Sequence, residues 1–406
     1  MNCEWTIKTW GELATLEYGR AFSGYRVGSG KYRVFGTNGP IGWTERALYP
    51  GPSVIIGRKG AYRGVHFSPE PFWAIDTAFY LKPKLSFNMK WAYYALLAQD
   101  INSLDSGSAI PSTSRSDFYA LSVKVPPINE QRRIADVLGL LDARRETLVA
   151  ENGTLESIAQ AVFKSWFIDF DPVHAKAAGA QPEGMDAETA ALFPNEFEDS
   201  ELGPIPIGWK VRSLDSIAVY TNGLALQKFP PESDTNFLPV IKIAQMRAGH
   251  TDGADKASNR LEPQYIVENG DVLFSWSGSL EVEIWTGGRG ALNQHIFKVT
   301  SNEAPKWYYY LATKHFLPRF RNIAASKATT MGHIRRRDLA EAKLAVPPVE
   351  VLPKLGQTIE VILERRILNA LKARTLAELR DALLPRLISG KLRIPEAEEL
   401  VEEAVS

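Results

Sequence analysis

The chain has 406 residues, with 47 basic and 47 acidic side chains and a hydrophobic share of 45%. This composition is typical of an ordinary folded protein, and the balanced charge excludes a protein that holds polyanions by bulk charge alone. The length exceeds what one hydrophobic core usually organises, so it favours two or three domains.

A single cysteine, Cys3, excludes an internal disulfide and a cysteine-rich zinc site, which favours a reducing compartment. The first residues, MNCEWTIKTW, lack the basic and apolar regions of a signal peptide, and no segment approaches 18 consecutive apolar residues. We therefore expect a cytoplasmic protein.

The chain contains an internal repeat. Trp5 and the residues after it recur from Trp209, 204 residues later, and the Val-Pro-Pro at Val125 recurs at Val346, after which the offset of 221 holds without a gap. Loops tolerate insertions, whereas one extra residue in a packed helix rotates its apolar face by about 100°. Each half is therefore predicted to be a variable globular domain followed by a constrained helix.

Within the globular parts, residues 54–56 and 271–274 are short β-type runs, and residues 89–98 and 305–313 have the pattern of aromatic-rich helices. After Pro127, an apolar seam with helical spacing contains Ile134, Leu138, Leu141, Leu148, Leu155, Val162 and Trp166. Gly139 and Gly153 allow a kink in this helix. Asn152, on the seam, either fixes the register of a helix pair or is solvated at a break.

The second half has a matching apolar stripe, and residues 357–384 contain neither Pro nor Gly, enough for about 42 Å of helix. Between the halves, residues 169–201 are strongly acidic and are predicted to be a solvated linker rather than core. These patterns predict a globular domain at 1–127, a helix at 128–168, an acidic linker at 169–205, a second domain at 206–348, a second helix at 349–390 and an acidic tail at 391–406.

Each long helix must bury its apolar stripe, and the other half supplies the only stripe of equal length. The predicted fold class is therefore α+β, with two pseudo-symmetric mixed α/β domains separated by a pair of long antiparallel helices. Two related domains at a fixed separation suit the recognition of a divided target. DNA is the obvious one, because the predicted helix exceeds one turn of a duplex, about 34 Å.

The loops contain residue types that suit DNA, since Arg and Lys bind phosphates and guanine, and Asn and Gln bind adenine. Each of these side chains alone also fits a simple solvated surface, but clustered cations repel one another unless an anion arrives. The candidates in the first half are Lys31, Arg33, Asn38, Arg58, Lys59, Tyr62, Arg63, Ser112, Thr113, Ser114 and Arg115. Those in the second half are Lys242, Gln245, Arg247, Trp276, Arg289, Asn293, Gln294, His295, Lys327, Thr329, His333, Arg335, Arg336 and Arg337.

Signatures of catalysis are missing from the sequence. Residues 28–31, Gly-Ser-Gly-Lys, lack the spacing of a phosphate-binding loop, and neither a Gly-x-Ser-x-Gly nor a His-Glu-x-x-His motif occurs. Asp271, Glu281 and Glu283 lack the lysine that a metal-dependent nuclease site would need, and His295 lacks a second ligand. We expect a non-catalytic protein with no metal or cofactor of its own.

With these motifs in this order, the sequence resembles the specificity (S) subunit of Type I restriction-modification enzymes. The resemblance is carried by residues 35–43 (FGTNGPIGW), 56–60 (IGRKG), 72–77, 125–131 (VPPINEQ) and 379–390 (LRDALLPRLISG). It implies two target-recognition domains that each read half of a divided DNA site, joined by antiparallel helices that set the spacer. One departure is that Glu130-Gln131 aligns with Val351-Leu352, so a contact at that corner is expected to differ.

The resemblance also implies partners. Two methyltransferase (M) subunits would bind S-adenosylmethionine and methylate adenine, and restriction (R) subunits would use ATP and magnesium to translocate and cleave DNA. The expected function is thus a DNA-binding specificity subunit that positions these enzymes on double-stranded DNA. The alternative is a stand-alone DNA-binding regulator that needs no enzyme partner.

Overall fold

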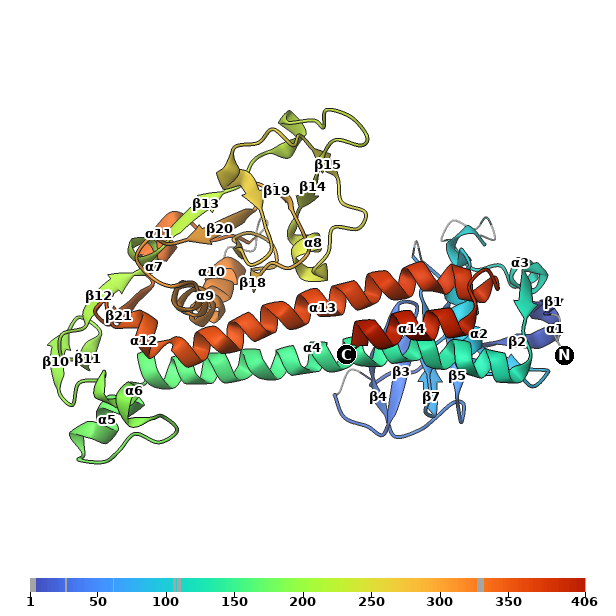
Figure 1. The fold of residues 1–406 in the computed structure, drawn as a ribbon, viewed down its shortest axis with the longest axis horizontal. Coiled ribbons are helices and arrows are strands. Elements are labelled where there is room, and N and C mark those ends of the chain that lie inside the picture. Colours follow the sequence, from blue (N-terminus) through green and yellow to red (C-terminus); the bar gives the residue numbers. More distant parts are fainter. Residues whose placement is uncertain are drawn as a thin grey trace. The chain divides into compact units, whose positions relative to one another are not determined.

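The computed structural model describes residues 5–25, 28–60, 62–104, 107, 111–326 and 332–405. The chain divides into two compact units, which we call unit 1 (Met1–Glu146 with Thr375–Ser406) and unit 2 (Thr147–Arg374). Each unit contains one globular domain together with a segment of each of the two long helices (Figure 1).

The domain of unit 1 is built on two sheets. The larger one is antiparallel, in the order β2-β8-β5-β6, and the smaller one has the order β4-β3-β7, with β3 and β7 parallel. The strands are β1 (Thr6–Thr9), β2 (Ala14–Tyr18), β3 (Tyr32–Gly36), β4 (Gly39–Thr44), β5 (Ser53–Gly57), β6 (Val65–Ser68), β7 (Phe72–Ala74), β8 (Ala78–Pro83) and β9 (Ser122–Val125). The helices of this domain are α1 (Trp10–Leu13), α2 (Met89–Leu97), η1 (Ile101–Ser103) and α3 (Arg115–Ala120).

The domain of unit 2 also has two sheets, in the orders β13-β20-β17-β18 and β15-β14-β19-β16. Its strands are β12 (Lys210–Ser213), β13 (Val219–Asn222), β14 (Leu238–Ile241), β15 (Lys256–Ala257), β16 (Ile266–Val267), β17 (Val272–Ser275), β18 (Val282–Ile284), β19 (Gly290–Leu292), β20 (Ile296–Thr300) and β21 (Lys343–Val346). Its helices are α7 (Leu214–Ile217), η2 (Leu226–Lys228), α8 (Ile243–Ala248), η3 (Pro263–Tyr265), α9 (Lys306–His315), α10 (Leu317–Ser326) and α11 (Arg336–Ala340).

The sequence repeat is also a repeat of topology. β2-β8-β5-β6 in unit 1 matches β13-β20-β17-β18 in unit 2, and the short pair β1-β9 matches β12-β21. The register agrees as well, since Tyr18 of β2 faces Phe79 of β8 and Asn222 of β13 faces Phe297 of β20. The predicted fold class of two related mixed α/β halves with a long helix pair is confirmed.

The two long helices are α4 (Ile128–Phe167) and α13 (Gln357–Ile388). In unit 1, Lys124 just before α4 donates to the Ser389 carbonyl, and Asp142 of α4 pairs with Arg380 of α13, so the two segments run antiparallel. α4 passes through Gly139 and Gly153 without interruption, so the break considered there does not occur. In unit 2, Asn152 Nδ2 donates to the Arg366 carbonyl of α13 at 3.0 Å, which makes Asn152 an interhelical contact.

The corner at the start of each long helix differs between the halves, as Glu130-Gln131 against Val351-Leu352 predicts. Gln131 accepts from the Asn88 amide and donates to the Pro126 carbonyl, both at 2.8 Å, and so braces the start of α4. In the second half Leu352 is buried, and the chain makes an extra turn, α12 (Leu352–Leu355), before α13 begins. The same corner is thus held by hydrogen bonds in one half and by apolar packing in the other.

The prediction of a solvated linker at 169–205 is wrong. The segment forms α5 (Asp171–Ala177), α6 (Ala187–Ala191) and a hairpin of β10 (Phe197–Ser200) and β11 (Gly203–Pro206). Val173 and Phe193 are buried in the core of unit 2, and the Phe193 ring lies 5.7 Å from that of Trp166. The charged side chains of this segment lie on the surface, and a few apolar side chains pack into the core. The average composition of the segment therefore did not reveal that it is folded.

The acidic tail is also folded. Residues 394–405 form α14 (Ile394–Val405), and Ile394, Ala397 and Val401 on one face of it are buried. Glu398 on this helix pairs with Arg133 of α4 at 2.6 Å. The spacing of three and four residues is that of an amphipathic helix packed on its apolar side. Within the described part of the chain, every helix is too short or too polar to cross a membrane.

Candidate functional site

In unit 1, several of the predicted DNA contacts meet where β2 and β5 end and β8 begins, beside the turn before α3. The Arg58 amide donates to the Thr77 carbonyl at 2.8 Å, and the Arg58 carbonyl accepts from the Thr113 amide at 2.9 Å. Lys59 and Ser112 form a β-bridge next to this pair. We call the accessible side chains here surface 1, and they are Tyr18, Arg58, Lys59, Ser114 and Arg115.

Two arginines of surface 1 flank one aromatic ring. The guanidinium carbons of Arg58 and Arg115 lie 4.9 and 5.1 Å from the ring centre of Tyr18, which is 48% exposed. Arg58 donates to the Asp76 carbonyl and Arg115 to the Tyr119 hydroxyl, and the latter bond raises the pKa of Arg115. Within the described ranges neither cation has a carboxylate partner, so the pair is suited to an anion such as phosphate.

Unit 2 repeats this backbone arrangement with other side chains. The Trp276 amide donates to the His295 carbonyl at 3.2 Å, and the Trp276 carbonyl accepts from the Ile334 amide at 3.0 Å. Ser277 and His333 form the corresponding β-bridge. Trp276 therefore occupies the place of Arg58, and Asn222 and Arg336 occupy those of Tyr18 and Arg115.

The corresponding face of unit 2 encloses a mostly apolar hollow of about 300 Å³. Its lining consists of Asn222, Trp276, Phe297, His333, Ile334, Arg335 and Arg336, which we call surface 2. Trp276 Nε1 donates to Asn222 Oδ1 at 2.8 Å, and the Arg336 guanidinium lies 5.8 Å from the Phe297 ring centre. Surface 2 therefore combines a braced indole with two exposed cations, which suits contact with a base edge or sugar beside a phosphate.

The other candidates of unit 1 divide into surface and buried residues. Lys31 and Arg33 are exposed on β3 or just before it, where Arg33 lies 3.8 Å from the Trp43 ring centre. The turn with Asn38 lies against surface 1, because Thr37 donates to the Lys59 carbonyl, and Tyr62 nearby is 68% exposed.

Two candidates of unit 1 have buried side chains that bond to neighbouring backbone carbonyls. Arg63 is only 2% exposed, and it donates to the carbonyls of Asn102 and Gly60 at 2.6 and 3.1 Å. The Thr113 hydroxyl is buried and donates to the Gly57 carbonyl at 2.8 Å. Both side chains hold the loops of surface 1 in place, and sequence alone could not tell this role from DNA contact.

The remaining candidates of unit 2 lie in three places. Asn293, Gln294 and His295 form a turn at the edge of surface 2, with the His295 Nδ1 3.0 Å from the Ser277 hydroxyl. Around β14 and α8, Lys242 pairs with Asp255 and the Gln245 side-chain oxygen is buried, whereas Arg247 is exposed. Arg289, just before β19, lies 3.5 Å from Glu268. Arg337 is exposed beside Asp338, whereas Lys327 and Thr329 lie outside the described residues.

Sequence reasoning missed Tyr18 and Asn222, which form the middle of the two surfaces. A signal was present, because the early offset of 204 aligns them and each precedes a glycine at the end of a strand. Tyr18 and Asn222 end equivalent strands of the repeat but differ in side chain, and that difference at aligned positions would have identified them.

The carboxylates considered for a nuclease site are otherwise engaged. Asp271 pairs with Lys298 at 2.7 Å, and Glu281 pairs with Arg321 at 2.8 Å. Glu283 bonds to two cations that are described below. No group of three or more potential metal ligands occurs in the part of the chain that the structure describes.

The family model of the Type I restriction modification DNA specificity domain matches residues 2–157 and 206–380, one match in each half. The chain belongs to this family of Type I restriction specificity subunits. The specificity subunit recognises the DNA target of a restriction-modification complex and is not its catalytic subunit.

Curated relatives and a solved structure agree with this assignment. The chain is 24% identical to the HindI specificity subunit of Haemophilus influenzae, over 74% of both chains, and 23% identical to the MjaIX specificity subunit of Methanocaldococcus jannaschii, over 86% of this chain and 79% of the relative. It is 25% identical to the EcoKI specificity subunit of Escherichia coli K12, over 85% and 74%. The crystal structure of the S subunit from M. genitalium shares the fold, with a TM-score of 0.56, 18% identity and coverage of 96% and 97%.

Proposed function

We propose that this specificity subunit reads a divided DNA site, with surface 1 on one half-site and surface 2 on the other. The observation that carries the proposal is that two domains of one topology place different side chains at equivalent positions. Tyr18 and Arg58 stand in one domain where Asn222 and Trp276 stand in the other. A shared framework with different contact residues is what reading two unlike sequences requires.

The contacts divide by chemistry. Arg58, Arg115, Arg335 and Arg336 are proposed to bind phosphates, because they are accessible and lack carboxylate partners among the described residues. The loop side chains beside them are proposed to reach base edges or sugars. These are Lys31, Arg33, Asn38, Lys59, Tyr62, Ser112 and Ser114 in unit 1, and Trp276, Gln294, His295 and His333 in unit 2. Asn293 is only 6% exposed and accepts from the His295 amide, so it is proposed to hold the turn rather than to contact DNA.

We further propose that residues 1–127 and 206–348 are the two target-recognition domains and that α4 and α13 set the gap between half-sites. The long helices are also proposed to dock two M subunits. Leu140 of α4 and Val361 of α13 support this, because they are 221 residues apart and 46% and 60% exposed. A repeated apolar contact suits two copies of one partner. R subunits would join the same complex in the cytoplasm and, with the M subunits, supply the chemistry of S-adenosylmethionine, ATP and magnesium.

Mapping of methylated adenines tests the proposal. The chain is co-expressed with the M subunit of its system in a host without adenine methylation, and the genome is then sequenced for methylated adenine. We expect one asymmetric motif of two defined half-sites with a constant gap of unspecified bases. An undivided motif would contradict the proposal that each surface reads one half-site. Absence of methylation, together with tight DNA binding by the chain alone, would favour the stand-alone regulator.

The salt dependence of DNA binding tests the phosphate contacts of surface 1. In the assembled complex, Arg58→Ala with Arg115→Ala should reduce the slope of log affinity against log salt by about 1.8, since each phosphate contact contributes about 0.9. Arg393, which is 85% exposed and pairs with Glu396 on the surface of unit 1, supplies the control Arg393→Ala. An unchanged slope in the double variant would remove both arginines from the interface.

A further inference from the structure

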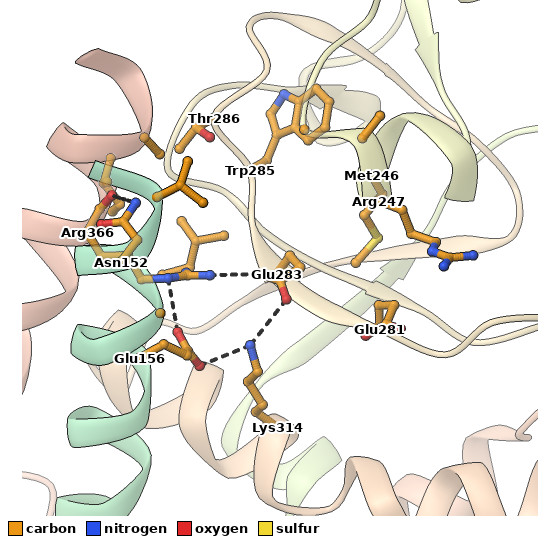
Figure 2. Close-up of a pocket in the computed structure, with 17 residues that line it drawn as sticks. Asn152, Glu156, Met246, Arg247, Glu281, Glu283, Trp285, Thr286, Lys314 and Arg366 are labelled. Carbon is orange, nitrogen blue, oxygen red and sulfur yellow. Dashed lines mark hydrogen bonds and ion pairs between the residues drawn. The ribbon is translucent and has the colours of Figure 1, made fainter. Parts of the chain in front are cut away.

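Four charged side chains form a closed ring in unit 2 (Figure 2). Lys314 Nζ lies 2.9 Å from Glu156 Oε1 and 3.2 Å from Glu283 Oε1. Arg366 completes the ring, with Nε 3.1 Å from Glu156 Oε2 and a terminal nitrogen 2.8 Å from Glu283 Oε2. Two cations and two carboxylates therefore balance one another within a single cluster, which we call the charge ring.

The charge ring is largely withdrawn from solvent. The side chains of Lys314 and Glu156 are each 13% exposed and that of Arg366 is 17% exposed, while Glu283 reaches 33%. The buried Tyr310 hydroxyl donates to Glu156 Oε2 at 2.9 Å and accepts from Lys314 at 2.8 Å. Burial alone raises the pKa of Glu156, but Arg366 and Lys314 outweigh it and hold that pKa below its ordinary value. Glu156 is therefore ionised at neutral pH.

The four members come from four different elements. Glu156 lies on α4 and Arg366 on α13, so the helix pair supplies one charge of each sign. Glu283 lies on β18 and Lys314 on α9, so the recognition domain supplies the other two. Two of the four ion pairs, Lys314 with Glu156 and Arg366 with Glu283, therefore join the domain to a long helix. The other two pairs lie within the helix pair and within the domain.

Elsewhere in this junction apolar packing joins the domain to the helices, because Phe163 of α4 and Leu363 of α13 share a buried core with Tyr308 of α9, but the space beside the ring is not filled. A cavity of about 520 Å³ lies beside the ring, and its lining comes both from the helices, including Asn152 and Arg366, and from the domain, including Met246 and Trp285 (Figure 2). Apolar contacts tolerate sliding, whereas hydrogen-bonded ion pairs have defined distances and angles. A buried ion pair adds little stability compared with apolar packing. What it adds to the junction is a defined direction of contact.

We propose that the charge ring fixes the angle at which the second recognition domain sits on the helix pair, and so makes Glu283 and Lys314 positioning residues for the gap between half-sites. The proposal rests on the proposed reading of a divided site. Unit 1 has a simpler arrangement, in which Tyr94 is the one residue of the domain, among those that the structure describes, that bonds to the pair of Asp142 and Arg380. The ring therefore assigns the stricter angular control to the second domain.

The test uses the full complex with M subunits and a set of duplexes whose half-sites are separated by the native gap or by one or two base pairs more or fewer. Glu283→Gln with Lys314→Met removes both domain charges and leaves Glu156 paired with Arg366, so no buried charge is orphaned. We expect the ratio of methylation rates on the native gap to those on the altered gaps to fall at least tenfold. Lys314→Arg, which keeps the charge, should retain most of that ratio.

Lys298→Met with Asp271→Asn is the matched control, because that pair is also partly buried, at 15% and 23% exposure, but lies within the domain. This control should leave the ratio of methylation rates on the native gap to those on the altered gaps, the gap selectivity, unchanged. Equal selectivity of the ring variant and the native protein would overturn the proposal. If the double variant fails to fold, Glu283→Gln alone is measured, and it must show the same relaxation. A native protein that shows no gap selectivity at all would instead refute the proposed function.

Discussion

The junction of Tyr94, Asp142 and Arg380 in unit 1 allows a quantitative stability prediction. Tyr94 donates to Asp142 Oδ2 at 2.6 Å, and Arg380 contacts Asp142 Oδ1 at 2.9 Å. Asp142→Asn keeps the shape of the side chain and removes its charge. The tyrosine bond then changes from charge-assisted to neutral, a loss of about 1 kcal/mol.

The ion pair supplies the second part of the effect. The Asp142 and Arg380 side chains are 19% and 21% exposed, and Arg380 keeps Asp381 as a partner at 2.7 Å, so its charge is not orphaned. Loss of the pair should therefore cost only about 1 kcal/mol. Together the two losses predict that Asp142→Asn lowers the free energy of unfolding by about 2 kcal/mol.

Urea unfolding followed by circular dichroism measures this change. The control is Asp381→Asn, because that carboxylate is 61% exposed and its loss should cost less than about 0.5 kcal/mol. If both variants lose the same small amount, the buried hydroxyl and carboxylate do not stabilise unit 1 as argued. A loss well above about 3 kcal/mol would mean that Arg380 is left effectively unpaired.

Two further predictions concern backbone packing and pH. A Cβ at Gly356 would lie 1.9 Å from Cε2 of Trp307, so Gly356→Ala should destabilise the protein by about 3 kcal/mol in urea unfolding. Gly153→Ala, where a Cβ meets nothing within 4 Å, should stabilise α4 by up to about 1 kcal/mol, and equal effects would contradict this account. Arg366 and Lys314 hold the pKa of Glu156 below its ordinary value of 4.5. The ionised form of Glu156 therefore stabilises the fold above that pH, and this contribution is lost as pH falls through the folded pKa. The difference in unfolding free energy between the native protein and Glu156→Gln should therefore shrink below about pH 4.5, and a difference that grows there would refute the sign.

The helices were the most predictable part of the chain. Apolar residues at helical spacing indicate a helix with one buried face, so α4 and α13 could be predicted from the sequence. Ile134, Leu138, Leu141 and Leu148 on the predicted seam are all at most 1% exposed. The repeat also predicted that the two domains share one topology, since aligned residues imply aligned strands.

Local composition was a poor guide where few residues decide the packing. The segment at 169–205 has a high charge density, yet the buried Val173 and Phe193 determine that it folds onto unit 2. Arg58 of surface 1 and Arg63 lie five residues apart in one loop and have the same side chain. One side chain stacks beside Tyr18 while the other is buried against Gly60 and Asn102, and only the path of the backbone separates the two roles.

The sequence by itself determined the duplication, the two long helices, the family and the kind of target, because these depend on periodicity and on motifs that are local in the chain. Tertiary structure alone decided which side chains share a surface. Trp276 and Arg336 are 60 residues apart in sequence and line one hollow, and the four members of the charge ring are drawn from residues 156 to 366. Contacts between distant positions follow from how sheets and helices pack, which no local pattern encodes.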